Sequence, residues 1–290
     1  MERLQLRSSY LSRIHKLIQW SRYKEALAEA EEWVREAPED DEAIAWLAYV
    51  HRFTDADKAL HWSGEAIRRN PECETAWQVR LFVAYEREDW KSFDQVSEEM
   101  LRMFPEEAYI YRLKAQRELG RKKVAEARGL LEQAISLEHS SNNFAVYAYA
   151  LALSGNDDAS RDAAATALRI DPEDVQTLLY TGWAADHRSD YEHALERLGA
   201  AVRQNPDNAQ AREEYLNILQ KSYWFYRVLL APRFLTRMKP WQIFFIWVVC
   251  WILLKPLIVL FIVLYIASYW ISKWLVHLKI FGFRRAPRRK

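Results

Sequence analysis

The stretch GWAADHRSDYEHALERLGAAVRQNP, residues 182–206, carries the pattern that decides the fold. An apolar segment is followed by the polar turn HRSD, and a second apolar segment ends at proline. Proline has no N–H donor and its ring clashes with the preceding helical turn, so it marks the end of a helix. The stretch therefore predicts a helix, a short turn, a second helix and a stop.

The same pattern recurs along the first 208 residues. Prolines 38, 71, 105, 172 and 206 are separated by 33, 34, 67 and 34 residues, and the gap of 67 divides at His139 into 34 and 33. A fixed period of this length is the signature of a stacked helical repeat. The predicted units are residues 7–40, 41–73, 74–107, 108–141, 142–174 and 175–208.

Small side chains recur in phase with the prolines, where two helices must approach closely. Twelve residues before each unit's proline place stand Ala26, Ala59, Phe93, Ala127, Ser160 and Ala194. Five residues before it stand Trp33, Ala66, Met100, Ala134, Ala167 and Ala201.

This pattern resembles the tetratricopeptide repeat, a 34-residue helix-turn-helix unit with small residues at its eighth, twentieth and twenty-seventh places and proline at its thirty-second. In the quoted stretch, Gly182, Tyr191, Ala194, Ala201 and Pro206 all fall on places of this motif. The resemblance implies an all-α fold, a right-handed superhelix of about six units with a concave groove, closed by a capping helix at 209–222.

Some units depart from the family pattern. Unit one has Ile14 and Trp33 at small places, unit three has Phe93 and Met100, and unit four has His139 in place of proline. We expect these units to stack with locally wider helix spacing.

In this family the first helix of each unit lines the groove. The resemblance therefore implies a protein-binding or peptide-binding groove, and two interpretations of its aromatic side chains stay open. The rings either hold an apolar or extended peptide inside a rim of arginines, or fill gaps between drifted repeats. The asparagine of the carboxylate-clamp members would fall at aromatic places, which disfavours a chaperone-tail binder. The predicted groove residues are Tyr49, Arg52, Phe82, Tyr85, Arg112, Gln116, Tyr149, Trp183 and His187.

Sequence signatures of catalysis are missing. There is no GxxxxGK[ST] or GxGxxG phosphate loop, no HExxH, no CxxC and no GxSxG. The seven histidines have no helical ligand spacing. We expect a non-enzyme with no catalytic, cofactor or metal site and no small-molecule substrate.

Charge divides the chain into two parts. Residues 227–290 hold 12 of the 41 Lys and Arg residues and none of the 40 Asp and Glu residues. An acidic body joined to a basic, apolar tail is typical of attachment to a membrane, and it does not favour a nucleic-acid partner.

Residues 241–278 form an apolar run too long for one membrane crossing. A hydrocarbon core of about 30 Å takes roughly 20 helical residues, whereas these 38 would span about 57 Å as one helix. Lys255 and Pro256 divide the run into 241–254 and 257–275. A turn there would let the lysine reach water, so we favour a membrane hairpin over a kinked single span.

The basic flanks agree with a hairpin, since short basic segments stay on the cytoplasmic side and a hairpin keeps both flanks there. Residues 223–240 are expected to lie on the membrane surface as an amphipathic segment. The cytoplasmic tail, 279–290, would serve either as a topology signal or as a contact for lipid headgroups. The tail residues predicted to make that contact are Arg284, Arg285, Arg288, Arg289 and Lys290.

Together these features predict a tetratricopeptide-repeat scaffold or adaptor anchored in the cell membrane by its C-terminal segment. Its repeats would face the cytoplasm and recruit a protein or peptide to the bilayer. The alternative is a structural subunit of a larger membrane complex, held mainly through its transmembrane segment. The sequence leaves open whether the chain forms a homo-oligomer.

Overall fold

The computed structural model describes residues 2–223, 241, 244, 248 and 255–281. The chain divides into two compact units, Met1–Arg117 and Glu118–Lys290. We describe each unit by itself. The described part is built from α-helices and short turns and contains no strand, so the predicted all-α repeat fold is confirmed.

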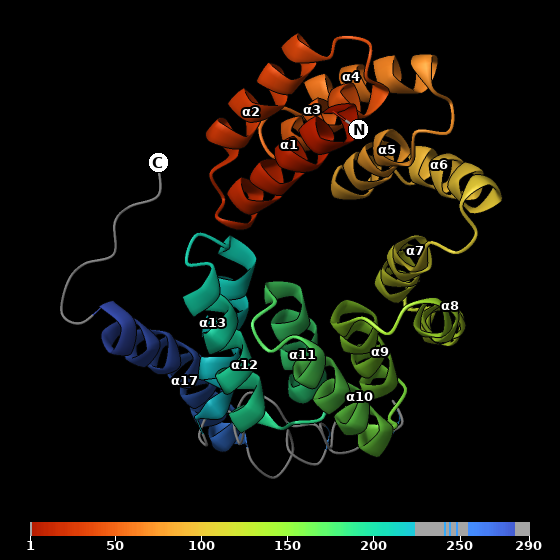
Figure 1. Cartoon of the computed structure of the whole chain (residues 1–290). Helices are drawn as coiled ribbons and strands as arrows, with labels where there is room; N and C mark the ends of the chain where they lie inside the picture. Colours follow the sequence, from red (N-terminus) through yellow and green to blue (C-terminus); the bar gives the residue numbers. More distant parts are fainter. Residues whose placement is uncertain (1, 224–240, 242–243, 245–247, 249–254, 282–290) are drawn as a thin grey trace. The chain divides into compact units, whose positions relative to one another are not determined.

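The first unit is a stack of paired helices (Figure 1). Each helix packs against its successor from α1 to α6, and the first helices α3 and α5 also pack on each other. Helix α7 begins in this unit and ends just beyond its boundary. The helices are α1 (Glu2–Gln19), α2 (Tyr23–Glu36), α3 (Asp41–His51), α4 (Ala56–Arg69), α5 (Glu74–Glu86), α6 (Trp90–Met103) and α7 (Ala108–Gly120).

The second unit continues the same arrangement. Successive helices from α8 to α13 pack on each other, α9 also packs on α11, and the apolar helix α17 contacts α13. The helices are α8 (Val124–Leu137), α9 (Ser141–Leu153), α10 (Asp157–Ile170), α11 (Val175–His187), α12 (Tyr191–Gln204), α13 (Ala209–Ser222) and α17 (Lys255–Phe281).

Several helices start at a short polar side chain that caps them. A carboxylate or amide oxygen accepts a backbone N–H of the first turn, which satisfies a donor that has no partner inside the helix. These capping residues are Asp40, Asp55, Asp89, Asp174, Asp190 and Asn208.

The turn inside a repeat has a recurring left-handed residue. Glu88, Lys122, Gly155 and Ser189 have φ angles of 55°, 62°, 77° and 67°, and they follow one another at the repeat period. Ser21, with a φ of 56°, occupies the corresponding turn of the first helix pair. This conformation favours glycine, yet only one of the five is glycine. The turn geometry is therefore set by the repeat and not by the residue.

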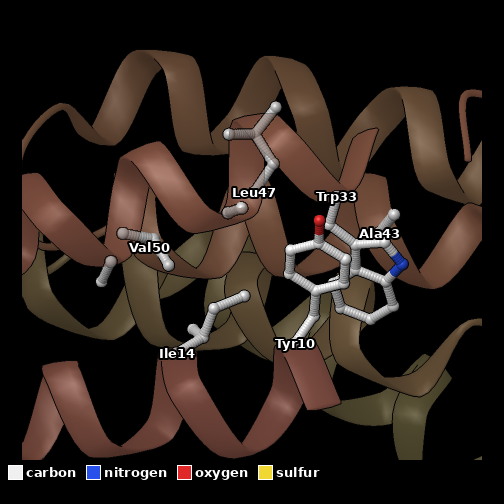
Figure 2. Packing of buried hydrophobic residues seen from close by; sticks show 8 residues of the cluster. Tyr10, Ile14, Trp33, Ala43, Leu47 and Val50 are labelled. Atoms are coloured by element: carbon white, nitrogen blue, oxygen red, sulfur yellow. The ribbon is translucent and has the colours of Figure 1, made fainter. Parts of the chain in front are cut away.

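Large residues at small places are accommodated within the core. Ile14 and Trp33 are fully buried, and the Tyr10 ring stacks on Trp33 with centroids 5.7 Å apart (Figure 2). Phe93 and Met100 are also fully buried, in a separate cluster of the same unit. The repeats that depart from the family pattern therefore still bury these large side chains completely. The wider helix spacing expected for them stays a prediction.

The missing proline of unit four is replaced by an amide. Helix α8 ends at Leu137, and His139 at the proline place is exposed. The Asn143 side-chain amide donates to the Glu138 and Ala134 carbonyls at 2.9 and 3.3 Å. These bonds give two carbonyls at the end of α8 a second donor, beside the backbone N–H groups of Glu138 and Ser140, and so fix the end of the helix.

Helix α17 begins at the lysine and proline that divide the apolar run. Pro256 is its second residue, a place where a missing N–H has no cost. The helix runs beyond the predicted 257–275, and Val259–Ile280 is long and apolar enough to cross a membrane. The predicted first arm, 241–254, lies outside the described residues except for Trp241, Phe244 and Val248. The segment 224–240 and the tail arginines also lie outside them, so the hairpin stays a prediction.

Gly182 provides a test of the close approach between paired helices. A Cβ at this residue would lie 2.8 Å from Cγ of Leu198, which is fully buried. We expect Gly182→Ala to lower the free energy of unfolding by about 1–3 kcal/mol, because the leucine must move within a packed core. Urea unfolding of the full chain in detergent, followed by circular dichroism, measures this.

Gly129→Ala is the matched control, since Gly129 lies inside α8, is exposed, and a Cβ there meets nothing within 4 Å. Alanine is the better helix former, so stability should rise by up to about 1 kcal/mol. Equal effects of the two substitutions would contradict the packing argument.

Candidate protein-binding surface

All nine predicted groove residues lie on the first helices of their repeats or at the ends of those helices. Tyr49 is on α3 and Arg52 is its C-terminal cap residue, while Phe82 and Tyr85 are on α5. Arg112 and Gln116 are on α7, Tyr149 is on α9, and Trp183 and His187 are on α11. Because the set divides between the two units, we describe the residues of each unit by themselves.

Arg52 is the centre of the surface in the first unit. Its guanidinium carbon lies 4.9, 4.5 and 4.4 Å from the ring centroids of Tyr49, Phe53 and Phe82. Its Nη1 pairs with Glu86 Oε1 at 3.3 Å, and the Arg52 side chain is only 10% exposed. The cation is therefore held between rings of two consecutive repeats, where desolvation strengthens cation–π attraction.

The rings around Arg52 also pack on one another. Tyr49 lies 4.9 Å from Trp46 and 5.9 Å from Phe53, and Phe82 stacks on Tyr109 at 6.1 Å. Trp46, Tyr49, Phe53, Phe82 and Tyr109 are all half-buried. We call this set, with Arg52, the Arg52 cluster. It combines structural packing with a partly exposed aromatic face, so both interpretations of the rings apply to it.

Tyr85 belongs to a different cluster on the same helix. Its ring lies 5.8 Å from both Trp90 and Phe93, and Arg117 stacks on these last two rings and pairs with Asp94. Burial raises the pKa of the Tyr85 hydroxyl. Arg112 and Gln116 are half-buried on α7. Tyr85 therefore packs against the second helix of its repeat, α6, and does not belong to the Arg52 cluster.

The second unit brings Tyr149 and Trp183 together. Their ring centroids are 5.9 Å apart, and Tyr180 completes a triad at 6.1 Å from Tyr149 and 4.8 Å from Trp183. All three rings are half-buried, and burial raises the pKa of the Tyr149 hydroxyl. His187, one turn beyond Trp183, is exposed. We call these three rings the Tyr149 triad.

Acidic side chains border both surfaces. Burial raises the pKa of the Glu86 carboxyl, and Arg52 opposes that rise. Burial likewise raises the pKa of Glu214, opposed by Lys221, which pairs with Asp186 at 2.7 Å. Each carboxylate lies near a cation, so neither surface presents bare negative charge. Among the residues that the structure describes, no group of three His, Cys, Asp or Glu side chains could hold a metal ion.

Sequence reasoning missed Phe53, Tyr109 and Tyr180. Tyr180 lies one helical turn before Trp183, so the i, i+3 spacing could have identified it. Phe53 follows the end of α3 and Tyr109 opens α7 in the next repeat, so their places depend on how the turns and repeats pack. Side-chain directions across helices do not follow from a repeat period alone.

Comparison with solved structures identifies the fold class. The chain is similar to the Cut9–Hcn1 hetero-tetramer of APC/C, with a TM-score of 0.59 and 13% identity over 73% of this chain and 42% of the other. It thus spans less than half of that chain. A tetratricopeptide repeat protein from Parabacteroides merdae gives a TM-score of 0.56 and 13% identity over 70% of this chain and 80% of the other.

Pseudomonas aeruginosa PilF gives a TM-score of 0.52 and 18% identity over 73% of this chain and 98% of the other. No family model matches the sequence, and no curated protein matches it. These structural likenesses establish the tetratricopeptide-repeat fold, a class defined here by paired helices with close contacts at small places.

Replacing Arg52 tests its place in the cluster. We expect Arg52→Ala to lower the free energy of unfolding by about 1–3 kcal/mol, because the substitution removes a nearly buried cation from three rings and from Glu86. Urea unfolding of the full chain measures the loss.

Arg87→Ala is the matched control. Arg87 caps α5 as Arg52 caps α3, but it pairs with Asp57 at the surface, where the two side chains are 43% and 83% exposed. Its removal should change stability by less than about 0.5 kcal/mol. If Arg87→Ala lowers the free energy of unfolding as much as Arg52→Ala does, the rings around Arg52 contribute nothing to stability.

Proposed function

We propose that the chain is a membrane-anchored scaffold that binds a protein or an extended peptide through its aromatic surfaces and holds it at the cytoplasmic face of the membrane. The observation that carries the proposal is the combination of half-buried aromatic faces on the first helices with an apolar C-terminal helix whose stretch Val259–Ile266 is exposed on every side.

The aromatic surfaces suit a protein partner. Tyr, Trp and Arg are enriched among the residues that dominate the binding energy of protein interfaces. Tyr and Trp bury a large area with little loss of side-chain freedom. The Arg52 cluster and the Tyr149 triad present these residue types together, on helices that the repeat holds in place. A solved structure of this fold is the Cut9–Hcn1 hetero-tetramer, in which the repeat chain stands in a complex of several chains. That precedent supports a scaffold role here.

Exposure of α17 supports membrane attachment. Val259–Ile266 are eight consecutive apolar residues, each 45% to 64% exposed. Successive residues of a helix point 100° apart, so this stretch is apolar and uncovered all round. A membrane supplies the hydrocarbon that such a surface needs. Basic flanks and the lack of acidic residues after residue 226 favour the cytoplasmic side for both ends.

The alternative function has one specific observation in its favour. Trp270, Ile271 and Trp274 are 66%, 49% and 58% exposed on α17, and such a face could pack against other membrane proteins. The chain would then be a structural subunit of a membrane complex. The following test separates the two functions.

Removing rings from the two surfaces tests the scaffold function. We expect the triple variant Tyr49→Ala, Phe82→Ala and Trp183→Ala to lose at least tenfold of the protein that co-purifies with the full chain from membranes, as expected when interface hot spots are truncated. Quantitative mass spectrometry of the purified complexes measures this.

Trp20→Ala is the control, because Trp20 is an exposed ring, 56% accessible, outside both surfaces. It should leave the partners unchanged. If the triple variant keeps its partners while Trp270→Ala with Trp274→Ala loses them, the membrane-subunit alternative holds and the scaffold function fails.

A charge in α17 tests the anchor. Lysine at the centre of a membrane helix costs about 2.5–3.5 kcal/mol, so we expect Ile262→Lys to release much of the chain from membranes on alkaline extraction. Ile280→Lys, at the end of the same candidate span, should stay in the membrane fraction, because its amine reaches the headgroups. Equal retention of both variants would contradict the anchor.

A further inference from the structure

A cleft lies between α13 and α17 in the second unit. It has a volume of about 440 Å³. Leu216 and Gln220 of α13 form one wall, and Trp270, Lys273, Trp274 and His277 of α17 form the other. The cleft thus joins the last helix of the repeat stack to the candidate membrane helix.

The surface of α17 changes in character before it reaches this cleft. Val259–Ile266 are exposed on every side, whereas Ser268, Ser272 and Val276, spaced four residues apart on one face, are 5%, 0% and 5% exposed. The last turns of α17 therefore pack against protein, and α13 contacts this helix. From Lys255 to Trp274 the helix rises about 28 Å, close to the hydrocarbon core's thickness of about 30 Å.

Trp270, Lys273 and Trp274 have the chemistry of a membrane boundary. The two indoles are 66% and 58% exposed, and tryptophan concentrates at the level of the lipid headgroups. Lys273 lies between them and is exposed, with its Nζ 4.7 Å from the Tyr269 ring centroid. A lysine in this position extends its amine toward headgroup phosphates. These side chains follow the stretch that is exposed on every side, Val259–Ile266, and in a membrane-spanning α17 they would lie at the level of the headgroups.

We propose that the cleft between α13 and α17 binds the headgroup of an anionic phospholipid. The Lys273 ammonium supplies the positive charge for the phosphate, and the Gln220 amide supplies a neutral donor from the opposite wall. The indoles of Trp270 and Trp274 contact the glycerol and the upper acyl chain. Among the described residues that line the cleft, none carries a carboxylate that would repel the anion.

A phospholipid matches the cleft better than a soluble anion does, because the polar side chains Gln220 and Lys273 line the cleft together with the apolar rings of Trp270 and Trp274. The phosphate end meets Lys273, while the adjoining exposed apolar stretch of α17 takes the acyl chains. Binding would also hold α13, and the repeats behind it, against the bilayer. This proposal rests on the membrane attachment proposed above, and it assigns the cleft one class of ligand.

Native mass spectrometry of the full chain in detergent, with added phosphatidylglycerol or phosphatidylcholine, tests the site. We expect phosphatidylglycerol to be retained in preference to phosphatidylcholine. Lys273→Gln should lower its retention about five- to tenfold, as expected for the loss of one basic contact. Lys279→Gln, on the same helix but outside the cleft lining, should lower it less than twofold. Equal losses in both lysine variants would show unspecific charge attraction and overturn the proposal.

A second pair of variants tests the wall formed by α13. Gln220→Leu should lower phosphatidylglycerol retention, whereas Asn217→Leu, on an exposed face of the same helix, should not. Millimolar inorganic phosphate should fail to displace the lipid; displacement would identify a soluble-anion site and overturn the proposal. Alkaline extraction of the unsubstituted chain separates the two levels of inference. If that chain stays in the membrane and Lys273→Gln leaves lipid retention unchanged, the lipid site alone is overturned. If the unsubstituted chain is itself released, the anchor is overturned as well.

Discussion

Close approach between paired helices is the constraint on which the other features depend. Small residues such as Ala26, Ala59, Ala127 and Ala194 are fully buried at the helix contacts, and at Gly182 even a methyl group has no room beside Leu198. In the second unit, the Ser160 hydroxyl crosses from α10 to donate to the Ala148 carbonyl of α9 at 2.6 Å. Because the paired helices leave no room for large side chains at these contacts, the large aromatic side chains of the first helices lie on other faces. There they form the two aromatic surfaces.

The two aromatic surfaces differ in chemistry. The Arg52 cluster holds a cation that is nearly buried, stacked on three rings and paired with one carboxylate. The Tyr149 triad is made of rings alone. One unit therefore offers a cation shared between rings and a carboxylate, and the other offers uncharged rings.

The sequence predicted the repeat fold because proline stops and small residues act locally, within one helix pair. It also placed the candidate residues on first helices, since the family pattern fixes each position within its repeat. It did not predict that Asn143 replaces the proline of unit four, or that Phe53 and Tyr109 complete the Arg52 cluster. These features depend on side-chain directions between neighbouring elements, which no single period specifies. The sequence also did not predict that α17 changes from exposed at Ile266 to buried on one face from Ser268 onward, because that burial depends on packing against another helix.

The left-handed turn residues show what determines the geometry of the turn in each repeat. Glu88, Lys122 and Ser189 adopt a backbone conformation that costs a residue with a side chain about 1 kcal/mol or more, and each does so at the same place in its repeat. An unfavourable local conformation survives only where the surroundings determine it. The backbone hydrogen bonds that close these turns, such as Asp89 N–H to the Ala84 carbonyl and Asp190 N–H to the Ala185 carbonyl, lie within one helix pair. Each helix pair therefore imposes the left-handed conformation on whichever residue stands there, so the sequence of the turn can change while its geometry is kept.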